Sequence, residues 1–302
     1  MTIELTKERE EPNPLGPLQN PGRGGGLVDV FRRRYLLRLL VRKELRVRYQ
    51  GSPVGLLWSY VKPAVRFLMY FWVIGLLIGS HKLPDRALHI FSGMVMVSFF
   101  TDALTSGSKS VVRNKSLVRK INMPREMFPV ATIAVSAYHL VPMYVILLIG
   151  GFLSGWHPDM MAFVAAGMAL AIVMLFGLGV ALLLSAWNVY FRDVSNVVDV
   201  LQTVITWTVP MIYPFGILME RLQHAHAVVY EIYLSSPLCI AVLLNNRAFW
   251  TPSSPTPKIF ERQELPTHLF DRGAIMIVVG VAFVFFAQAV FARLEGNFAE
   301  KL

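Results

Sequence analysis

Residues 160–187 read MMAFVAAGMALAIVMLFGLGVALLLSAW, a run of 28 residues without one charged side chain. As an α-helix this run is about 42 Å long, at about 1.5 Å per residue. The hydrocarbon core of a bilayer is about 30 Å thick, so about 20 apolar residues are enough to cross it. The run therefore predicts a transmembrane helix.

Five further segments are apolar over a comparable length, so the sequence predicts six transmembrane spans. They cover residues 60–79, 88–106, 128–154, 200–218 and 273–292. The segment 200–218 is the most polar, with Gln202, Thr203, Thr206, Thr208 and Pro210. A polar stripe within a span usually faces other helices or a water-filled path.

The composition agrees with an all-α integral membrane protein. Of 302 residues, 55% are hydrophobic and only 16% are charged, with a mean hydropathy of +0.51. An average soluble domain has about 25% charged residues. The net charge is +10, but the basic residues lie beside apolar runs. This placement favours anionic membrane lipid as the partner and argues against nucleic acid.

The basic residues also predict the topology, because cytoplasmic flanks are enriched in Lys and Arg. Nineteen flank the spans on one side: ten within 23–62, six within 108–126, and Arg192, Arg293 and Lys301. The other side has seven. Six spans with both termini in the cytoplasm satisfy this bias.

Residues 27–50 predict an amphipathic helix on the cytosolic leaflet. Its apolar side carries Leu36, Leu37, Leu40, Val41 and Val47, and the charges Arg33, Glu44 and Arg48 interrupt that side. Such a helix lies in the headgroup plane or packs on a partner protein, and both are possible together. Residues 1–26 are rich in Pro and Gly and have no apolar run, so we expect a disordered tail rather than a signal peptide.

The predicted external loop between the last two spans contains a second apolar region, residues 228–250. Ser235-Ser236-Pro237 predicts a break within it. Each half is too short to cross the bilayer, so the region predicts a re-entrant or interfacial pair of helices.

Motifs for common chemistry are absent from the sequence. It has no G-x-x-x-x-G-K-[ST] loop for ATP, no H-E-x-x-H or paired C-x-x-C for a metal and no G-x-S-x-G elbow. We therefore expect no catalytic residue, metal or bound cofactor. Asp102 and His139 lie within predicted spans, and interhelical hydrogen bonds are favoured over a proton-coupled carrier. Arg66 is expected to reach from its span to the cytosolic interface.

Four stretches resemble ABC-2 type permeases that export polysaccharides. They are RKELRVRYQGSPVGLLW at 42–58, NKSLVRKINMPRE at 114–126, NVYFRDV at 188–194 followed by PMIYP at 210–214, and SPL at 236–238. The last departs from the family, which commonly has Asn where this chain has Ser236.

The resemblance implies a homodimer with six spans per protomer and no ATPase activity of its own. Two copies of a separate ATP-binding subunit, which bind ATP and Mg, would dock at two cytosolic coupling segments, 108–126 and 188–199. The residues implied in this coupling are Asn114, Arg119, Lys120, Pro124, Arg125, Phe191, Arg192 and Asp193.

The resemblance also implies a transport path between the protomers, along spans 1, 2 and 5. Aromatic side chains of these spans are candidates for it: Tyr70, Trp72, Phe99, Phe100, Trp207 and Tyr213. Clustered cations of the amphipathic helix suit a lipid pyrophosphate or a protein partner. They are Arg38, Arg42, Lys43, Arg46 and Arg48.

The substrate expected from the resemblance is a polysaccharide on polyprenyl pyrophosphate, such as O-antigen, teichoic acid or mycobacterial galactan. Arginine outnumbers lysine by 20 to 9, which suits a GC-rich genome and favours the galactan exporters of bacterial plasma membranes. The alternatives are an ABC-2 exporter of drugs or small lipids, and a membrane enzyme acting on polyprenyl-linked sugars. The enzyme is disfavoured because no acidic cluster accompanies the spans.

Overall fold

The computed structural model of the chain describes residues 25–69, 72, 86–121, 123–216, 218, 227–253 and 257–302. Every regular element within these ranges is a helix, and no strand occurs in them. The predicted all-α fold is therefore confirmed for the described part of the chain. Of the predicted disordered tail, residues 1–26, only Gly25 and Gly26 are among the described residues.

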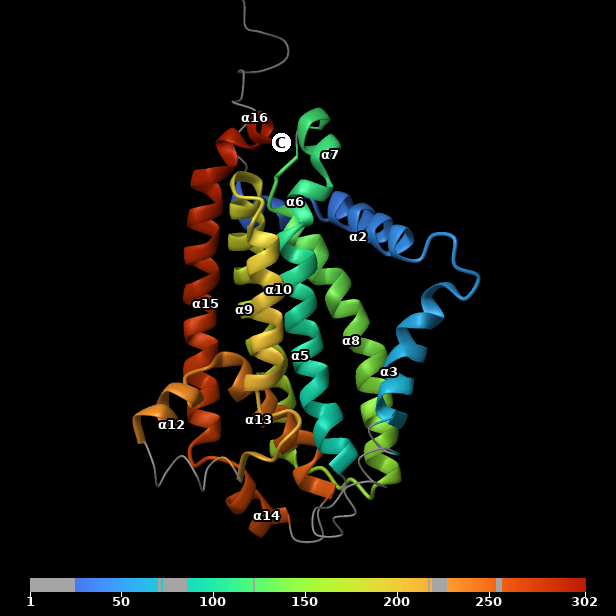
Figure 1. Cartoon of the computed structure of the whole chain (residues 1–302), viewed down its shortest axis with the longest axis vertical. Helices are drawn as coiled ribbons and strands as arrows, with labels where there is room; N and C mark the ends of the chain where they lie inside the picture. Colours follow the sequence, from blue (N-terminus) through green and yellow to red (C-terminus); the bar gives the residue numbers. More distant parts are fainter. Residues whose placement is uncertain are drawn as a thin grey trace, which may run out of the picture.

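Four long apolar helices form the body of the molecule (Figure 1). They are α5 (Arg86–Ser108), α8 (Met127–Leu153), α9 (Met160–Tyr190) and α15 (Leu269–Leu294). Within the described ranges, no other single helix is both long and apolar enough to cross a membrane. Each coincides with a predicted span to within four residues at either end. The α9 helix, which opened the sequence analysis, packs against α5, α13 and α15 and is the centre of the bundle.

Shorter helices complete the described chain. They are α1 (Gly26–Arg32), α2 (Arg34–Arg48), η1 (Gly55–Leu57), α3 (Trp58–Met69), α6 (Ser110–Arg113), α7 (Lys115–Lys120), α10 (Val194–Thr208), α12 (Ala227–Leu234), α13 (Pro237–Phe249), η3 (Thr251–Ser253), α14 (Pro257–Glu264), η4 (Glu295–Asn297) and α16 (Phe298–Lys301).

The first and fifth predicted spans differ from the prediction. Of the span 60–79, only residues 60–69 and Trp72 are described, so its length is not established. The span 200–218 is corrected: α10 begins six residues earlier, at Val194, and ends at Thr208. The cause is Pro210, which has no N–H to donate and disfavours helical backbone in the residue before it. Val209 accordingly has an extended backbone, with ψ of 140°.

The apolar region 228–250 contains the predicted break. The helices α12 and α13 meet there at an angle of 74°. Ser236 caps α13, because its Oγ accepts a hydrogen bond from the backbone N–H of Cys239, and Pro237 occupies the first turn. Ser and Asn are comparably good N-caps, so the departure at Ser236 keeps this function. Whether the pair is re-entrant stays a prediction.

Asp159 holds α13 to the start of α9. Its Oδ2 lies 2.8 Å from Nη2 of the buried Arg247, and its Oδ1 accepts a hydrogen bond of 2.8 Å from the N–H of Ala162. Hydrogen bonds from Arg247 lower the pKa of Asp159 below its ordinary value. The ion pair therefore anchors the bent helix pair at this end of the bundle.

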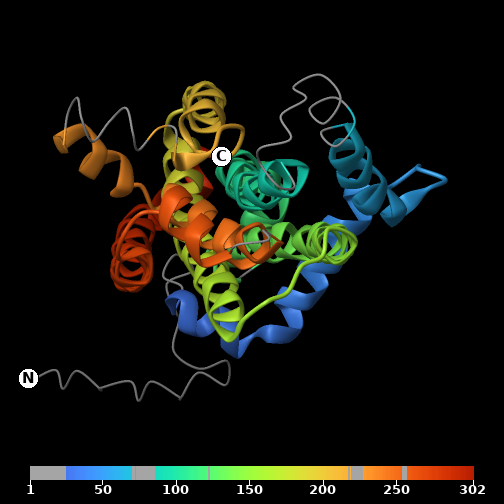
Figure 2. The same cartoon turned by 90° about the horizontal axis from the view of Figure 1, so that it is seen from below.

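The two ends of the bundle differ in their short helices (Figure 1). One end gathers α1, α2, α6, α7 and α16, and the other gathers α12, α13 and α14. The predicted cytosolic segments thus lie together, while their side of the membrane stays a prediction. The α2 helix runs across the bundle axis, and Figure 2 shows α3 at the rim beside α8, away from α15.

The predicted helix 27–50 is divided into α1 and α2 at Arg33, where φ is −92° and ψ is 40°. The division has a packing cause, since α1 contacts α15 whereas α2 contacts α8. The chain must turn between these two surfaces.

We expect Gly107→Ala to destabilise the protein. A Cβ at Gly107 on α5 would lie 2.7 Å from the Cβ of Ala181 on α9, so the two helices would have to separate. Overpacking of this kind costs about 1–3 kcal/mol. Thermal unfolding of the purified protein in nanodiscs should show a lower midpoint. Gly167→Ala on α9 is the matched control, because nothing lies within 4 Å of its added Cβ. Equal midpoints for the two variants would contradict the close α5–α9 contact.

Candidate functional site

The α2 helix attaches to the bundle through one face. Leu36, Leu37, Leu40 and Val41 pack there in a cluster that includes Val111 and Phe128. These four residues belong to the apolar side that the sequence predicted. Val47 is an exception to the prediction, because its side chain is 54% exposed. At this end of the helix, Glu44 and Arg48 occupy the face that points toward the bundle, and Val47 points away from it.

Glu44 connects α2 to the turn between α6 and α7. Its carboxylate lies 2.6 Å from Nη2 of Arg113 and accepts a hydrogen bond of 3.3 Å from Nδ2 of Asn114. Lys43 also contacts this carboxylate, at 3.2 Å. The Glu44 side chain is only 8% exposed. A buried carboxylate is costly unless it is paired, and these three partners meet that requirement.

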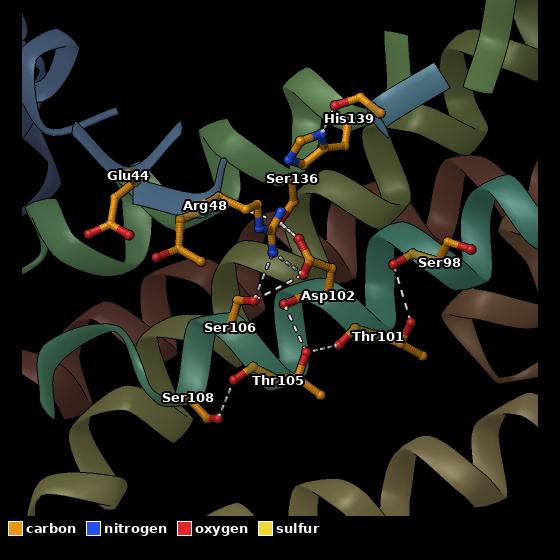
Figure 3. Close-up of polar contacts among 12 residues, drawn as sticks. Glu44, Arg48, Ser98, Thr101, Asp102, Thr105, Ser106, Ser108, Ser136 and His139 are labelled. Carbon is orange, nitrogen blue, oxygen red and sulfur yellow. Dashed lines mark hydrogen bonds and ion pairs between the residues drawn. The ribbon is translucent and has the colours of Figure 1, made fainter. Parts of the chain in front are cut away.

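Arg48, one turn further along α2, connects to α5 instead (Figure 3). Its Nη2 lies 2.8 Å from Oδ1 of Asp102 and 3.3 Å from Oγ of Ser106. Asp102 also accepts hydrogen bonds from Ser106 at 2.9 Å and from Ser136 of α8 at 2.6 Å. The guanidinium and carboxylate thus join α2, α5 and α8 at one point.

A partly open cavity of about 670 Å³ adjoins this ion pair. It lies among the end of α2, the segment that follows it, and helices α3, α5 and α8. Among the described residues that line it, the cations are Arg48, Lys62 and Arg66, and Asp102 is the one carboxylate. Its apolar wall consists of Trp58, Pro63, Phe99, Leu140 and Met143.

Hydroxyl and imidazole groups connect α3 to α8 across the cavity. Tyr49 Oη and Ser59 Oγ are 2.7 Å apart, and Ser59 Oγ is 3.2 Å from Nδ1 of His139. Asp102 and His139 therefore make the interhelical contacts that the sequence favoured for them. No cluster of three His, Cys, Asp or Glu side chains suited to a metal occurs among the described residues.

The chemistry of the cavity suits an amphiphile with an anionic headgroup. Three cations face one carboxylate, so an anion entering the cavity meets an excess of positive charge. Arg offers a bidentate fork to phosphate oxygens, and Lys offers a point charge. The apolar wall suits a hydrocarbon chain attached to the headgroup.

The five cations of α2 that were predicted to contact lipid phosphate have different surroundings in the structure. Only Arg48 lines the cavity, while Lys43 contacts Glu44 and Asn114. Arg38, Arg42 and Arg46 are exposed. Lys62 and Arg66 were not predicted as site residues, although their spacing of four puts both on one face of α3.

The predicted coupling residues fall into two groups. Arg119, Lys120, Phe191, Arg192 and Asp193 are exposed at the end of the bundle that carries α2, and the aromatic Phe191 is 67% exposed. Asn114, Pro124 and Arg125 are buried instead. Arg125 donates a hydrogen bond to the carbonyl of Glu295, and its guanidinium lies 5.8 Å from the ring centre of Phe298. Their part in coupling stays a prediction.

The predicted path aromatics are also divided. Trp72 and Trp207 are 60% and 70% exposed. Tyr213 is half-buried, and its hydroxyl donates to the carbonyl of Thr208 at 2.7 Å. Phe99 and Phe100 are buried in the core of the chain, and Phe99 also lines the cavity. Tyr70 lies outside the described residues.

A family model described as ABC-2 type transporter matches residues 35–241. This range begins in α2, contains every residue that lines the cavity and ends in α13. The chain belongs to the ABC-2 type transporter family.

Two relatives of this ABC-2 chain are named O-antigen export system permease protein RfbA. The Myxococcus xanthus protein is 23% identical over 280 residues, which cover 91% of this chain and 98% of the relative. The Klebsiella pneumoniae protein is 22% identical over 272 residues, which cover 88% of this chain and 95% of the relative. The similarity thus extends over nearly the whole length of both relatives.

We expect Arg125→Ala to lower stability and Arg119→Ala to leave it nearly unchanged. Arg125 is buried between the turn before α8 and the C-terminal segment, and its loss leaves the Glu295 carbonyl without this donor. Losing a buried charged donor costs about 1–3 kcal/mol. Arg119 is exposed on α7. Thermal unfolding in nanodiscs distinguishes the two, and equal losses would show that Arg125 does not hold this segment.

Proposed function

We propose that this ABC-2 permease exports a polysaccharide linked to polyprenyl pyrophosphate across a bacterial plasma membrane. Cell-wall galactan and O-antigen-like glycans are the proposed substrates. The names of the two relatives support polysaccharide export. The cavity supports a lipid pyrophosphate as the group that is recognised.

The cationic cavity is the observation that carries this proposal. Asp102 is the cavity residue of α5 nearest to the end of that helix at Ser108, from which it is six residues away. This separation is about 9 Å along the helix axis. The end of the cavity at Asp102 therefore lies near the interface where headgroups gather, if α2 lies on the membrane surface. A pyrophosphate would face Arg48, Lys62 and Arg66, and its first isoprene units would contact the apolar wall.

The energy for export comes, in this proposal, from ATP hydrolysed by a separate subunit present in two copies. ATP and Mg would bind to that subunit, and this chain would act as a homodimer without enzymatic activity. The exposed residues of α7 and of the turn after α9 would form the docking surface. Exposed Phe191 supports this role, because an exposed aromatic side chain at a polar end of the bundle suits a partner's pocket.

We expect Lys62→Gln with Arg66→Gln to reduce export at least tenfold. Two of the three cations would be lost, while the Arg48–Asp102 ion pair would remain. Cells depleted of the wild-type chain and supplied with the variant should accumulate lipid-linked glycan on the cytosolic side. Extraction and mass analysis of this lipid would also identify the glycan.

Arg32→Gln with Arg34→Gln is the matched control, since it removes two exposed cations of α1 and α2 outside the cavity. Export should stay near the wild-type level. Equal defects in the two double variants would show that the cavity has no special part. Loss of drug resistance without accumulated glycan would favour an exporter of drugs or small lipids.

We expect Arg192→Ala with Asp193→Ala to lower the ATP turnover of the reconstituted complex several-fold. These side chains lie exposed in the turn between α9 and α10, where docking would transmit movement to α10. Arg293→Ala, an exposed change on α15, serves as the control. Unchanged ATP turnover and export in the double variant would remove the coupling role of this turn.

A further inference from the structure

Two charges interrupt the inward face of α2, and each is tied to a different part of the chain. Glu44 and Arg48 are four residues apart and therefore share that face. Glu44 binds the cytosolic-end turn between α6 and α7, whereas Arg48 binds α5 beside the cavity. One helical turn thus links the predicted docking segment to a cation of the cavity.

The connection at Glu44 is tight. Its side chain is buried, with Arg113 at 2.6 Å and Asn114 at 3.3 Å. Asn114 is itself fixed, because its Nδ2 also donates to the carbonyl of Ser110 at 2.9 Å. A displacement of the α6–α7 turn must therefore carry Glu44 and α2 with it.

The connection at Arg48 is suited to exchange. The Arg48 side chain is 34% exposed and lines the cavity, so a change of side-chain conformation is enough for it to reach an anion there. Asp102 keeps hydrogen bonds from Ser106 and Ser136 when Arg48 departs. Its carboxylate would then lose one of three partners and not all of them.

Space for such a movement exists between the two ion pairs. A second cavity of about 100 Å³ is lined by residues of both pairs, Glu44 and Arg113 together with Arg48 and Asp102. A small displacement of α2 can therefore change the Arg48–Asp102 distance while the Glu44–Arg113 contact persists.

We propose that Glu44 is a positioning residue and that Arg48 exchanges its partner during transport. In one state Asp102 neutralises Arg48, and the cavity holds pyrophosphate weakly. When the α6–α7 turn moves, Glu44 draws α2 with it, and Arg48 leaves Asp102 for the pyrophosphate. Coupling between the α6–α7 turn and the substrate requires this kind of change, because a ligand that binds two states equally does not shift the equilibrium between them. The inference rests on the proposed function.

The test uses the permease with its ATP-binding partner in nanodiscs, with radiolabelled geranylgeranyl pyrophosphate as the probe. Binding is measured in the nucleotide-free and the vanadate-trapped states. We expect the wild-type dissociation constant to differ about tenfold between these states, within the usual range for coupled sites. Asp102→Asn should bind the probe tightly in both states, because it removes the competing carboxylate.

Glu44→Gln should bind the probe equally in both states, because the link to the α6–α7 turn is weakened. Arg113→Gln removes the other partner of the same ion pair. Because Arg113 is exposed, this variant can be used in place of Glu44→Gln if Glu44→Gln does not fold. Glu44→Arg combined with Arg113→Glu should restore the difference. Arg34→Gln, at the exposed start of α2, should behave as wild type. A merely structural role for Glu44 would change the yield of folded protein but would not equalise the two affinities.

The outcomes separate this inference from the proposed function. If Arg113→Gln and Glu44→Gln keep the wild-type difference between states, the positioning role is wrong while pyrophosphate binding stands. If the wild-type complex does not bind the probe in either state, the pyrophosphate specificity itself is wrong, and the inference falls with it.

Discussion

A charge within a membrane protein must find its partner inside the protein, and this constraint determines how α2 is attached. Lipid offers no hydrogen bonds, so an unpaired carboxylate there costs several kcal/mol. Asp102 lies within a membrane-crossing helix, and Arg48, Ser106 and Ser136 satisfy its oxygens. Only a helix lying across the bundle end brings Arg48 to this position. The Arg48–Asp102 ion pair therefore holds the end of α2 beside the cavity, in addition to the apolar face and the Glu44 contacts that attach the rest of the helix.

The long spans were predictable because their signal is local and large. A run of 28 uncharged residues has no soluble alternative, and α9 begins where that run begins. The fifth span was not predictable by hydropathy alone. Pro210 ends α10 through backbone chemistry that an average over 20 residues does not register. The division of α2 from α1 at Arg33 was equally hidden, since it follows from two different packing partners.

The site was only partly predictable, because it is assembled from distant segments. Periodicity placed Arg48 with the other cations of α2, yet only contacts with α5 and α8 distinguish it from Arg38 and Arg42. From the sequence, Lys62 and Arg66 are basic residues near the end of a span. Only the position of α3 in the fold shows that they line the cavity. In the sequence, Glu44 is one of the charges that interrupt the apolar side of the predicted helix 27–50. Its long-range partner, Arg113, is 69 residues away, and no local pattern indicates that pairing.

Stability alone does not account for charges on the inward face of α2. Replacing both partners of a buried ion pair by well-packed apolar side chains is often neutral or stabilising, so stability alone does not require charged pairs at these positions. Apolar contacts, however, cannot exchange one anion for another. An ion pair whose carboxylate keeps two hydroxyl donors can open at modest cost, and its free guanidinium then has a strong preference for phosphate. The proposed exchange thus explains Arg48 as a side chain whose ion pair opens during transport, and Glu44 as the side chain that keeps its partner and moves the helix.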